Sequence, residues 1–278
     1  MKRFSLVLLL AVITAGSAFA GNKNTTLDLD GLPDLWVYDN LDQQWVVRDE
    51  NLSPTACSVI EGGVEPGIRR LVRFTVTTPN SGDADLYVGD PNSLENKDLF
   101  EFAACHHHLH FKNYATYELI DPSNGHIWRA AKRGFCMLDT DPLPSAQGNE
   151  PPRAAQFRNC GTLDSPGYQG ISHGWMDTYR FFLGGQFFVL DGGDGQAPVP
   201  AGTYQIRVTV NPPYAPNNKG KCPLAKDAAT GLCHNFAESD YTNNVRTVTI
   251  TIPDHPGREG VGPLKNEPAL GYEPIDHQ

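Results

Sequence analysis

The chain has 278 residues, of which 40% are hydrophobic and 19% are charged, a composition typical of a globular protein with a full core. It carries 22 Lys and Arg against 32 Asp and Glu, for a formal net charge of -10, so we do not expect a general nucleic-acid binder. Its 27 glycines and 22 prolines favour many turns over many helices.

The first twenty residues predict a secretory signal peptide. Lys2 and Arg3 form a basic start, residues 6–13 are apolar, and residues 18–20 read Ala-Phe-Ala, the pattern of a cleavage site. No later segment is long and apolar enough to span a bilayer. We therefore expect a secreted or periplasmic protein whose six cysteines meet an oxidising compartment.

Beyond the signal, short segments of period-two alternation recur between turn-forming clusters. Strands are expected at 71–77, 204–210 and 245–252, and a hairpin is expected from 181–182 and 187–190 with Gly184 and Gly185 at its turn. No window carries a comparable helical period. These patterns predict a mainly β fold: an antiparallel β-sandwich with long decorating loops at 143–175 and 211–237. We expect one domain over 21–253 and a loosely structured tail over 254–278.

Residues 105–110 read Cys-His-His-His-Leu-His, the sharpest local feature of the chain. If this segment is a strand, His106, His108 and His110 share one face, and His107 has the wrong parity for a ligand unless the strand is bulged. Three imidazoles on one face suit a divalent transition metal, with copper and zinc both open. The alternative is an exposed polar strand that binds metal only adventitiously.

Five segments in order resemble the catalytic domain of the lysyl oxidase family, over about residues 32–253. Cys-His-His-His-Leu-His at 105–110 is similar to the family's copper-binding signature, and Tyr-Glu-Leu-Ile-Asp follows at 117–121. Lys-Arg-Gly-Phe-Cys at 132–136 resembles the segment of the cofactor lysine, and Gly-Trp-Met-Asp-Thr-Tyr at 174–179 that of the cofactor tyrosine. Glu-Ser-Asp-Tyr-Thr-Asn-Asn at 238–244 completes the set.

The resemblance implies a copper amine oxidase of the protein-lysine 6-oxidase type. Copper would be held by His106, His108 and His110. With dioxygen, Tyr179 would be oxidised to a quinone, and the amine of Lys132 would add to it to form lysine tyrosylquinone. Such a cofactor serves as the electron sink when primary amines, either peptidyl lysine or small amines, become aldehydes with release of hydrogen peroxide and ammonia.

The general base of this reaction is less well defined by the sequence. Asp177 and His173 both lie close to Tyr179 along the chain, and we take Asp177 as the candidate. Taken alone, an aspartate at the end of a strand is more often a turn residue.

The segment 238–244 also offers the hard oxygen donors that calcium prefers, at Glu238, Asp240, Asn243 and Asn244. The resemblance implies a structural calcium site that these residues share with Asp34 and the backbone carbonyl of Leu35. The alternative is an Asx-rich turn before the last strand.

Six cysteines allow fifteen disulfide connectivities. The resemblance implies a bond between Cys105 and Cys160. Cys222 and Cys233 are expected to close the insertion between them, which leaves Cys57 with Cys136.

Two other function classes compete with the oxidase. A secreted copper-binding β-sandwich without turnover would need the histidines but neither Lys132 nor Tyr179. An adhesion or carbohydrate-binding module with calcium as its functional ion would use the segment 238–244 and leave the histidines idle. The joint presence of histidines, lysine and tyrosine favours the oxidase.

Overall fold

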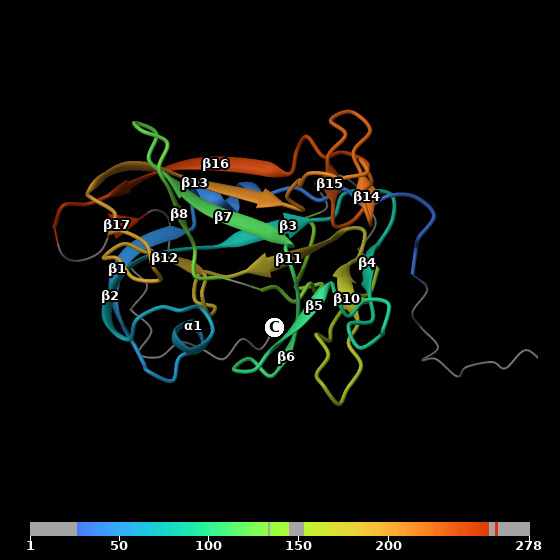
Figure 1. Cartoon of the computed structure of the whole chain (residues 1–278), viewed down its shortest axis with the longest axis horizontal. Coiled ribbons are helices and arrows are strands. Elements are labelled where there is room, and N and C mark those ends of the chain that lie inside the picture. The colour runs from blue at the N-terminus through green and yellow to red at the C-terminus, as the bar shows by residue number, and fades with distance from the viewer. Residues whose placement is uncertain (1–26, 133, 145–152, 256–258, 261–278) are drawn as a thin grey trace, which may run out of the picture.

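The computed structural model describes residues 27–132, 134–144, 153–255 and 259–260 (Figure 1). The expected signal peptide and nearly all of the expected tail lie outside these residues. In the described part, no helix is long and apolar enough to cross a membrane.

The described elements are short and almost all of them are strands. In chain order they are η1 (Asp39–Asp42), β1 (Trp45–Leu52), α1 (Cys57–Ile60), β2 (Gly67–Phe74), β3 (Val76–Pro79), β4 (Leu86–Gly89), β5 (Phe100–Ala103), β6 (His108–Phe111), β7 (Ala115–Ile120), β8 (Ile127–Arg129), β9 (Asp141–Pro142), β10 (Gln169–Ile171), β11 (Trp175–Tyr179), β12 (Phe187–Val189), β13 (Gly202–Val210), β14 (Ala225–Lys226), β15 (Cys233–His234), β16 (Val245–Ile252) and β17 (Glu259–Gly260).

One layer of the fold is the antiparallel sheet β16-β13-β7-β8, seen along the upper side of Figure 1. Buried and more exposed residues alternate along β13, with Tyr204, Ile206, Val208 and Val210 turned into the core. This alternation is the pattern of a strand that covers a core on one face only. The strands expected at 204–210 and 245–252 are confirmed.

The opposite layer contains the sheets β12-β2-β1-β17 and β3-β11-β9. The single strand expected at 71–77 is wrong, because the chain leaves one sheet at Phe74 and enters the other at Val76. Thr75 forms the link, and its N–H donates to the carbonyl of Gln44 at 2.9 Å. Residues 71–80 are buried throughout, so the alternation in the sequence did not mark an exposed face.

Aromatic and aliphatic side chains from both layers meet in one core. The rings of Phe74 from β2 and Tyr117 from β7 lie edge to face at a centroid distance of 5.3 Å, and Ile206 and Val208 of β13 belong to the same buried cluster. Burial of such side chains is the main favourable contribution to folding. The expectation of a mainly β, antiparallel fold is confirmed. The expected loops are not free of strands, because β10 lies within 143–175 and the pair β14-β15 lies within 211–237.

The hairpin expected over 181–190 is wrong in its first arm. Phe181 and Phe182 lie in a turn, and Phe187–Val189 pairs with β2 instead. The guanidinium of the fully buried Arg73 donates to the carbonyls of Phe181 and Leu183 at 3.1 and 3.2 Å. A buried arginine thus satisfies backbone groups that a partner strand would otherwise bond.

The disulfides are Cys57–Cys105, Cys136–Cys160 and Cys222–Cys233. The expected Cys222–Cys233 bond is confirmed, whereas the expected Cys105–Cys160 and Cys57–Cys136 bonds are wrong. Cys57 of α1 lies beside Cys105 with a Cα–Cα distance of 5.4 Å, and the Cα atoms of Cys136 and Cys160 are 5.5 Å apart. Both separations suit a disulfide. The bond to Cys105 therefore ties α1 to the histidine segment.

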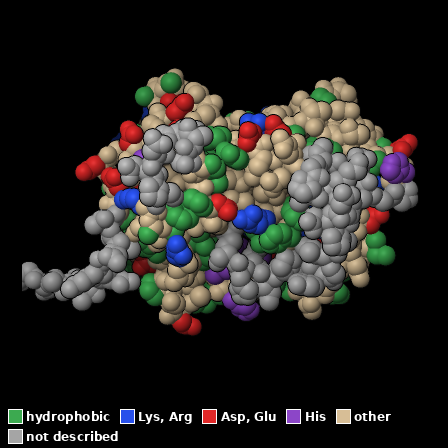
Figure 2. Space-filling model, turned by 180° about the vertical axis from the view of Figure 1, so that it is seen from behind, with side chains coloured by type: hydrophobic (Ala, Val, Ile, Leu, Met, Phe, Trp, Pro, Cys, Tyr) green, Lys and Arg blue, Asp and Glu red, His purple; other side chains and the backbone are tan. Residues whose placement is uncertain are grey.

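The surface carries charges of both signs. On the described part of the face in Figure 2, acidic and basic side chains are scattered among apolar ones without forming a basic stripe. This distribution agrees with the acidic net charge of the chain.

Candidate active site

The histidines lie on the hairpin of β5 and β6, but not all of them lie on a strand. β6 begins at His108, which pairs with Ala103, and His106 lies in the connecting turn. His107 adopts a left-handed backbone with φ 59°, and its N–H donates to the carbonyl of Ala103 at 2.8 Å. The expected placement of His106 on the strand is therefore wrong. The turn, and not strand periodicity, carries His106 toward the other two rings and leaves His107 exposed.

The three imidazoles nevertheless converge. Ring centroids are separated by 4.8 Å for His108 and His110, 5.2 Å for His106 and His110, and 5.7 Å for His106 and His108. Nε2 of His108 and Nε2 of His110 are 3.0 Å apart. Two imidazole nitrogens at about 2.0–2.1 Å from one ion are separated by about 3 Å, so this pair fits two ligands of a common metal.

The three rings lie near one another but are not assembled around an ion. No group of three or more His, Cys, Asp or Glu side chains within the described ranges is already arranged as a metal site. The chemistry of the donors fits copper or zinc equally, as expected from the sequence.

A glycine permits the close approach of another segment to His110. A Cβ atom at Gly134 would lie 2.3 Å from Nδ1 of His110 and 2.7 Å from its Cβ. His110 is only 6% exposed, so its ring has little room to move away. Gly134 therefore fixes the distance between the histidine hairpin and the segment that carries Lys132.

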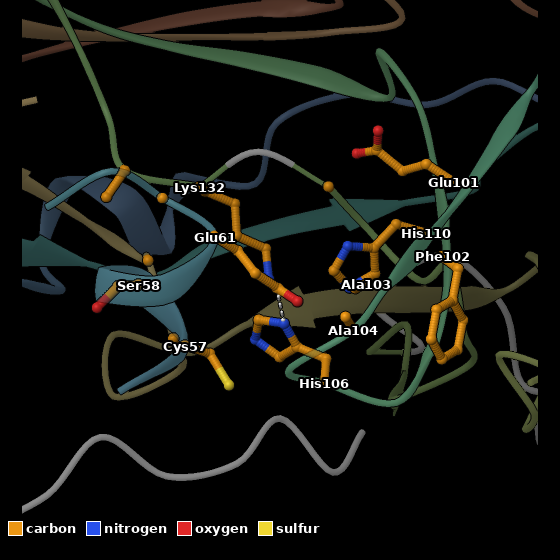
Figure 3. Close-up of a pocket in the computed structure, with 15 residues that line it drawn as sticks. Cys57, Ser58, Glu61, Glu101, Phe102, Ala103, Ala104, His106, His110 and Lys132 are labelled. Carbon is orange, nitrogen blue, oxygen red and sulfur yellow. Dashed lines mark hydrogen bonds and ion pairs between the residues drawn. The ribbon is translucent and has the colours of Figure 1, made fainter. Parts of the chain in front are cut away.

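Glu61, which sequence analysis did not single out, contacts the histidine turn directly. It follows α1, and its Oε2 lies 2.6 Å from Nδ1 of His106, while its Oε1 accepts a hydrogen bond from the backbone N–H of Cys105. Figure 3 shows the carboxylate and the His106 ring pointing toward each other. No sequence motif marks Glu61, because the contact depends on the Cys57–Cys105 bond.

Lys132 and Tyr179 lie side by side although they are 47 positions apart in the numbering of the chain. Nζ of Lys132 is 4.9 Å from the centroid of the Tyr179 ring and 5.8 Å from that of Phe135. Tyr179 is the last residue of β11 and is 1% exposed. Its hydroxyl donates to the carbonyl of Cys136 at 2.7 Å, which orients the ring.

Asp177 lies two residues before Tyr179 on β11 and is fully buried. Burial raises the pKa of Asp177 well above the ordinary value of an aspartate, and the nearby Tyr179 and Lys132 oppose that shift. His173, the other residue near Tyr179 in sequence, is exposed and lines a different surface hollow with Trp36 and Asn243. Of the two, Asp177 is the one that lies beside Lys132 and Tyr179.

A cavity of about 330 Å³ opens between α1, the histidine hairpin and the segment around Lys132. Among the side chains on its walls are Glu61, Glu101, His106, His110 and Lys132. Figure 3 shows Lys132 and His110 pointing toward the space beside Glu61. Glu101 and Phe102 lie beyond His110, away from Glu61. The arrangement combines candidate metal ligands, a primary amine and two carboxylates in one hollow.

The residues considered for calcium gather around Glu238. Its Oε2 accepts from the N–H of Leu35 at 2.7 Å, and its Oε1 accepts from the amides of Asn211 and Asn244 at 2.7 and 2.8 Å. Nearby, the amide of Asn243 donates to the carboxylate of Asp34 at 2.9 Å. This cluster joins the start of the described chain to the segment before β16.

Burial raises the pKa of Glu238 from 4.5 to about 7. Asp240 does not join the cluster, since it is exposed and its carboxylate accepts from the N–H and the hydroxyl of Thr242. Asp240 thus has the Asx-turn geometry that was the alternative to a ligand.

A β domain with convergent histidines, a lysine against a buried tyrosine and a shared cavity defines a candidate metal-dependent redox site. Comparison with known proteins identifies the family. The lysyl oxidase family model matches residues 43–235, so the chain belongs to the lysyl oxidase family. The match includes the histidines, Lys132 and Tyr179 but not the cluster around Glu238.

Individual relatives are distant. The chain is 27% identical over 191 residues to lysyl oxidase homolog 2 of Gallus gallus, covering 68% of this chain and 19% of that protein. It is 25% identical over 228 residues to lysyl oxidase homolog 4 of Homo sapiens, covering 78% of this chain and 25% of that protein. It is 26% identical over 190 residues to lysyl oxidase homolog 3B of Danio rerio, covering 68% of this chain and 18% of that protein. The chain therefore spans a quarter or less of the length of these relatives.

Proposed function

We propose that this protein is a secreted or periplasmic copper- and quinone-dependent oxidase of primary amines. The observation that carries the proposal is the position of the Lys132 amine, 4.9 Å from the centroid of the Tyr179 ring, behind a cavity lined by His106 and His110. A metal-binding domain without turnover has no need of that pair. Membership of the lysyl oxidase family supports the same conclusion.

In this proposal His106, His108 and His110 hold copper. When bound, copper supplies the one-electron chemistry with dioxygen that oxidation of the Tyr179 ring requires. The protein holds the Tyr179 ring in one orientation for that oxidation. The hydroxyl of Tyr179 donates to the carbonyl of Cys136, and the ring is buried. Lys132 is the amine placed to add to the ring.

The mature cofactor in this proposal is lysine tyrosylquinone, which provides an electron sink for the substrate amine. In the net reaction a primary amine, dioxygen and water give an aldehyde, ammonia and hydrogen peroxide. Asp177 is the proposed acceptor of the proton on the carbon next to the amine nitrogen. Its raised pKa makes the ionised carboxylate a strong base, and it must lose its own proton before it acts.

The substrate class follows from charge. Glu61 and Glu101 stand on the walls of the cavity, and the whole chain carries a net charge of -10. Carboxylates at a cavity attract a cationic ammonium group. We propose either a lysine side chain of another protein or a small primary amine as the substrate, together with dioxygen.

We further propose that the Glu238 cluster binds calcium as a structural ion. Support comes from the carboxylates of Asp34 and Glu238, which lie close to Leu35, and from the buried side-chain oxygens of Asn243 and Asn244, which accept no hydrogen bond. Oxygen donors of this kind are those calcium prefers. An ion there would link residues 34–35 to the segment before β16.

The test is amine-dependent release of hydrogen peroxide by the copper-loaded protein. Lys132→Ala and Tyr179→Phe should each abolish turnover while copper stays bound, and His108→Ala should abolish both. Tyr114→Phe is the matched control, because Tyr114 is equally buried and its ring centroid lies 6.4 Å from that of Tyr179. Full activity of Tyr179→Phe, or copper binding without turnover in the unaltered protein, would contradict the proposal.

A further inference from the structure

Both oxygens of the Glu61 carboxylate contact the histidine turn. Oε2 of the carboxylate meets Nδ1 of His106 at 2.6 Å, and Oε1 accepts the backbone N–H of Cys105, the residue just before it. Glu61 directly follows α1 and caps its C-terminal end, where its N–H donates to the carbonyl of Cys57 at 2.8 Å. One carboxylate thus holds both the backbone and the ring of the turn.

The disulfide makes this contact short and fixed. Cys57 at the start of α1 is bonded to Cys105, so the helix that carries Glu61 cannot separate from the turn that carries His106. Since the turn and not a strand positions His106, the pleat of a strand does not set the direction of its ring. Glu61 supplies the direction that the backbone does not.

The consequence for metal binding follows from imidazole chemistry. A neutral imidazole carries its hydrogen on one nitrogen and a lone pair on the other. A carboxylate has only acceptor oxygens, so it keeps the hydrogen on Nδ1 and leaves the lone pair on Nε2. Carboxylates that orient a ligating histidine in this way also increase its basicity.

We propose that Glu61 is a positioning residue that fixes the tautomer and ring direction of His106 for copper, an inference that rests on the copper site proposed above. Glu61 binds no metal in this proposal, and it acts through His106.

The substitution Glu61→Gln separates this role from simple packing. Glutamine keeps the size of the side chain but has one acceptor oxygen where glutamate has two. If that oxygen accepts the N–H of Cys105, the amide NH₂ faces Nδ1 of His106 and favours the hydrogen on Nε2, which removes the copper donor. If the oxygen turns to His106, two N–H donors face each other at Cys105.

The experiment measures the Cu(II) dissociation constant of the full chain by competition with a chromophoric chelator. Glu61→Gln should weaken binding by roughly 10–100-fold, the usual effect of losing a group that orients a metal ligand. The matched control is Glu101→Gln, which removes the same charge from the same cavity while the contact of Glu61 with His106 stays in place, and it should change affinity little. A Glu61→Gln protein with unaltered copper affinity would overturn the inference.

A second measurement needs neither copper nor the variant. In the metal-free protein, imidazole nitrogen chemical shifts should place the hydrogen of His106 on Nδ1, and the hydrogen on Nε2 would contradict the inference. A wild-type protein that binds no copper would overturn the proposed function and this inference together. Copper binding that is indifferent to Glu61 would overturn the inference alone.

Discussion

The substitution Gly134→Ala tests whether the close packing around His110 holds a metal ligand. The added Cβ would lie 2.3 Å from Nδ1 of His110, whereas carbon and neighbouring heavy atoms normally rest about 3.5–4.0 Å apart. His110 cannot escape into solvent, because it is 6% exposed and its backbone is paired with Glu101 of β5. The ring must therefore shift within the hairpin.

Two effects of different size are expected. Overpacking of this kind costs about 1–3 kcal/mol of the free energy of unfolding, which leaves the protein folded if its total stability is about 5–15 kcal/mol. Displacement of His110 should also weaken Cu(II) binding by roughly 10–100-fold, as for other changes that disturb the orientation of a ligand. Urea unfolding measures the first effect and chelator competition measures the second.

Gly82→Ala is the matched control. A Cβ there would lie 2.4 Å from the backbone nitrogen of Asp34 and would meet residues 32–34 instead of the histidine hairpin. It should lower stability comparably and leave copper affinity unchanged. If Gly134→Ala loses stability but binds copper as tightly as the unaltered protein, His110 is not a ligand and the reasoning fails.

Two further predictions concern stability. Because burial raises the pKa of Glu238 from 4.5 to about 7, the folded chain keeps a proton that the unfolded chain has lost between those values. The free energy of unfolding of the calcium-free protein should thus fall by about 3 kcal/mol as pH rises through that window, and a Glu238→Gln variant with the same slope would refute this. Removing the Cys57–Cys105 bond, which spans 48 residues, by Cys57→Ser with Cys105→Ser should cost about 4 kcal/mol in urea unfolding. The matched double change at Cys222 and Cys233, which are 11 residues apart, should cost about 3 kcal/mol, and the reverse order would contradict the loop-length argument.

Strands with one exposed face were predictable from the sequence. β13 alternates from Thr203 onward and β16 alternates along its length, because the sheet they form covers the core on a single side. The stretch 71–77 shows similar alternation but crosses between two sheets at Thr75, where both faces are buried. Periodicity reports side-chain polarity, and it does not report a change of hydrogen-bonding partner.

The histidine spacing predicted convergence for the wrong geometric reason. Alternate positions meet on a strand, but here a turn with a left-handed His107 brings His106 to the other rings. A single-residue backbone conformation of this kind has no signature in the spacing. Glu61 and Gly134 were equally invisible, because their roles exist only once α1 and the segment around Lys132 pack on the hairpin.

The disulfides illustrate the same limit. Cys222 and Cys233 are near in sequence and close a short loop, so their bond was predictable. The partners of Cys105 and Cys136 depend on which segments pack together in three dimensions. Six cysteines alone do not contain that information.

The most direct test of the central claim is a search for a covalent link between Lys132 and Tyr179. The mature protein would be loaded with copper in air, digested with trypsin and analysed by mass spectrometry, with Tyr179→Phe treated identically. We predict a cross-linked species that joins the Lys132 and Tyr179 peptides, a visible absorption that phenylhydrazine quenches, and neither signal in the variant. Copper-loaded protein in which both peptides remain linear and the absorption is absent would contradict the account.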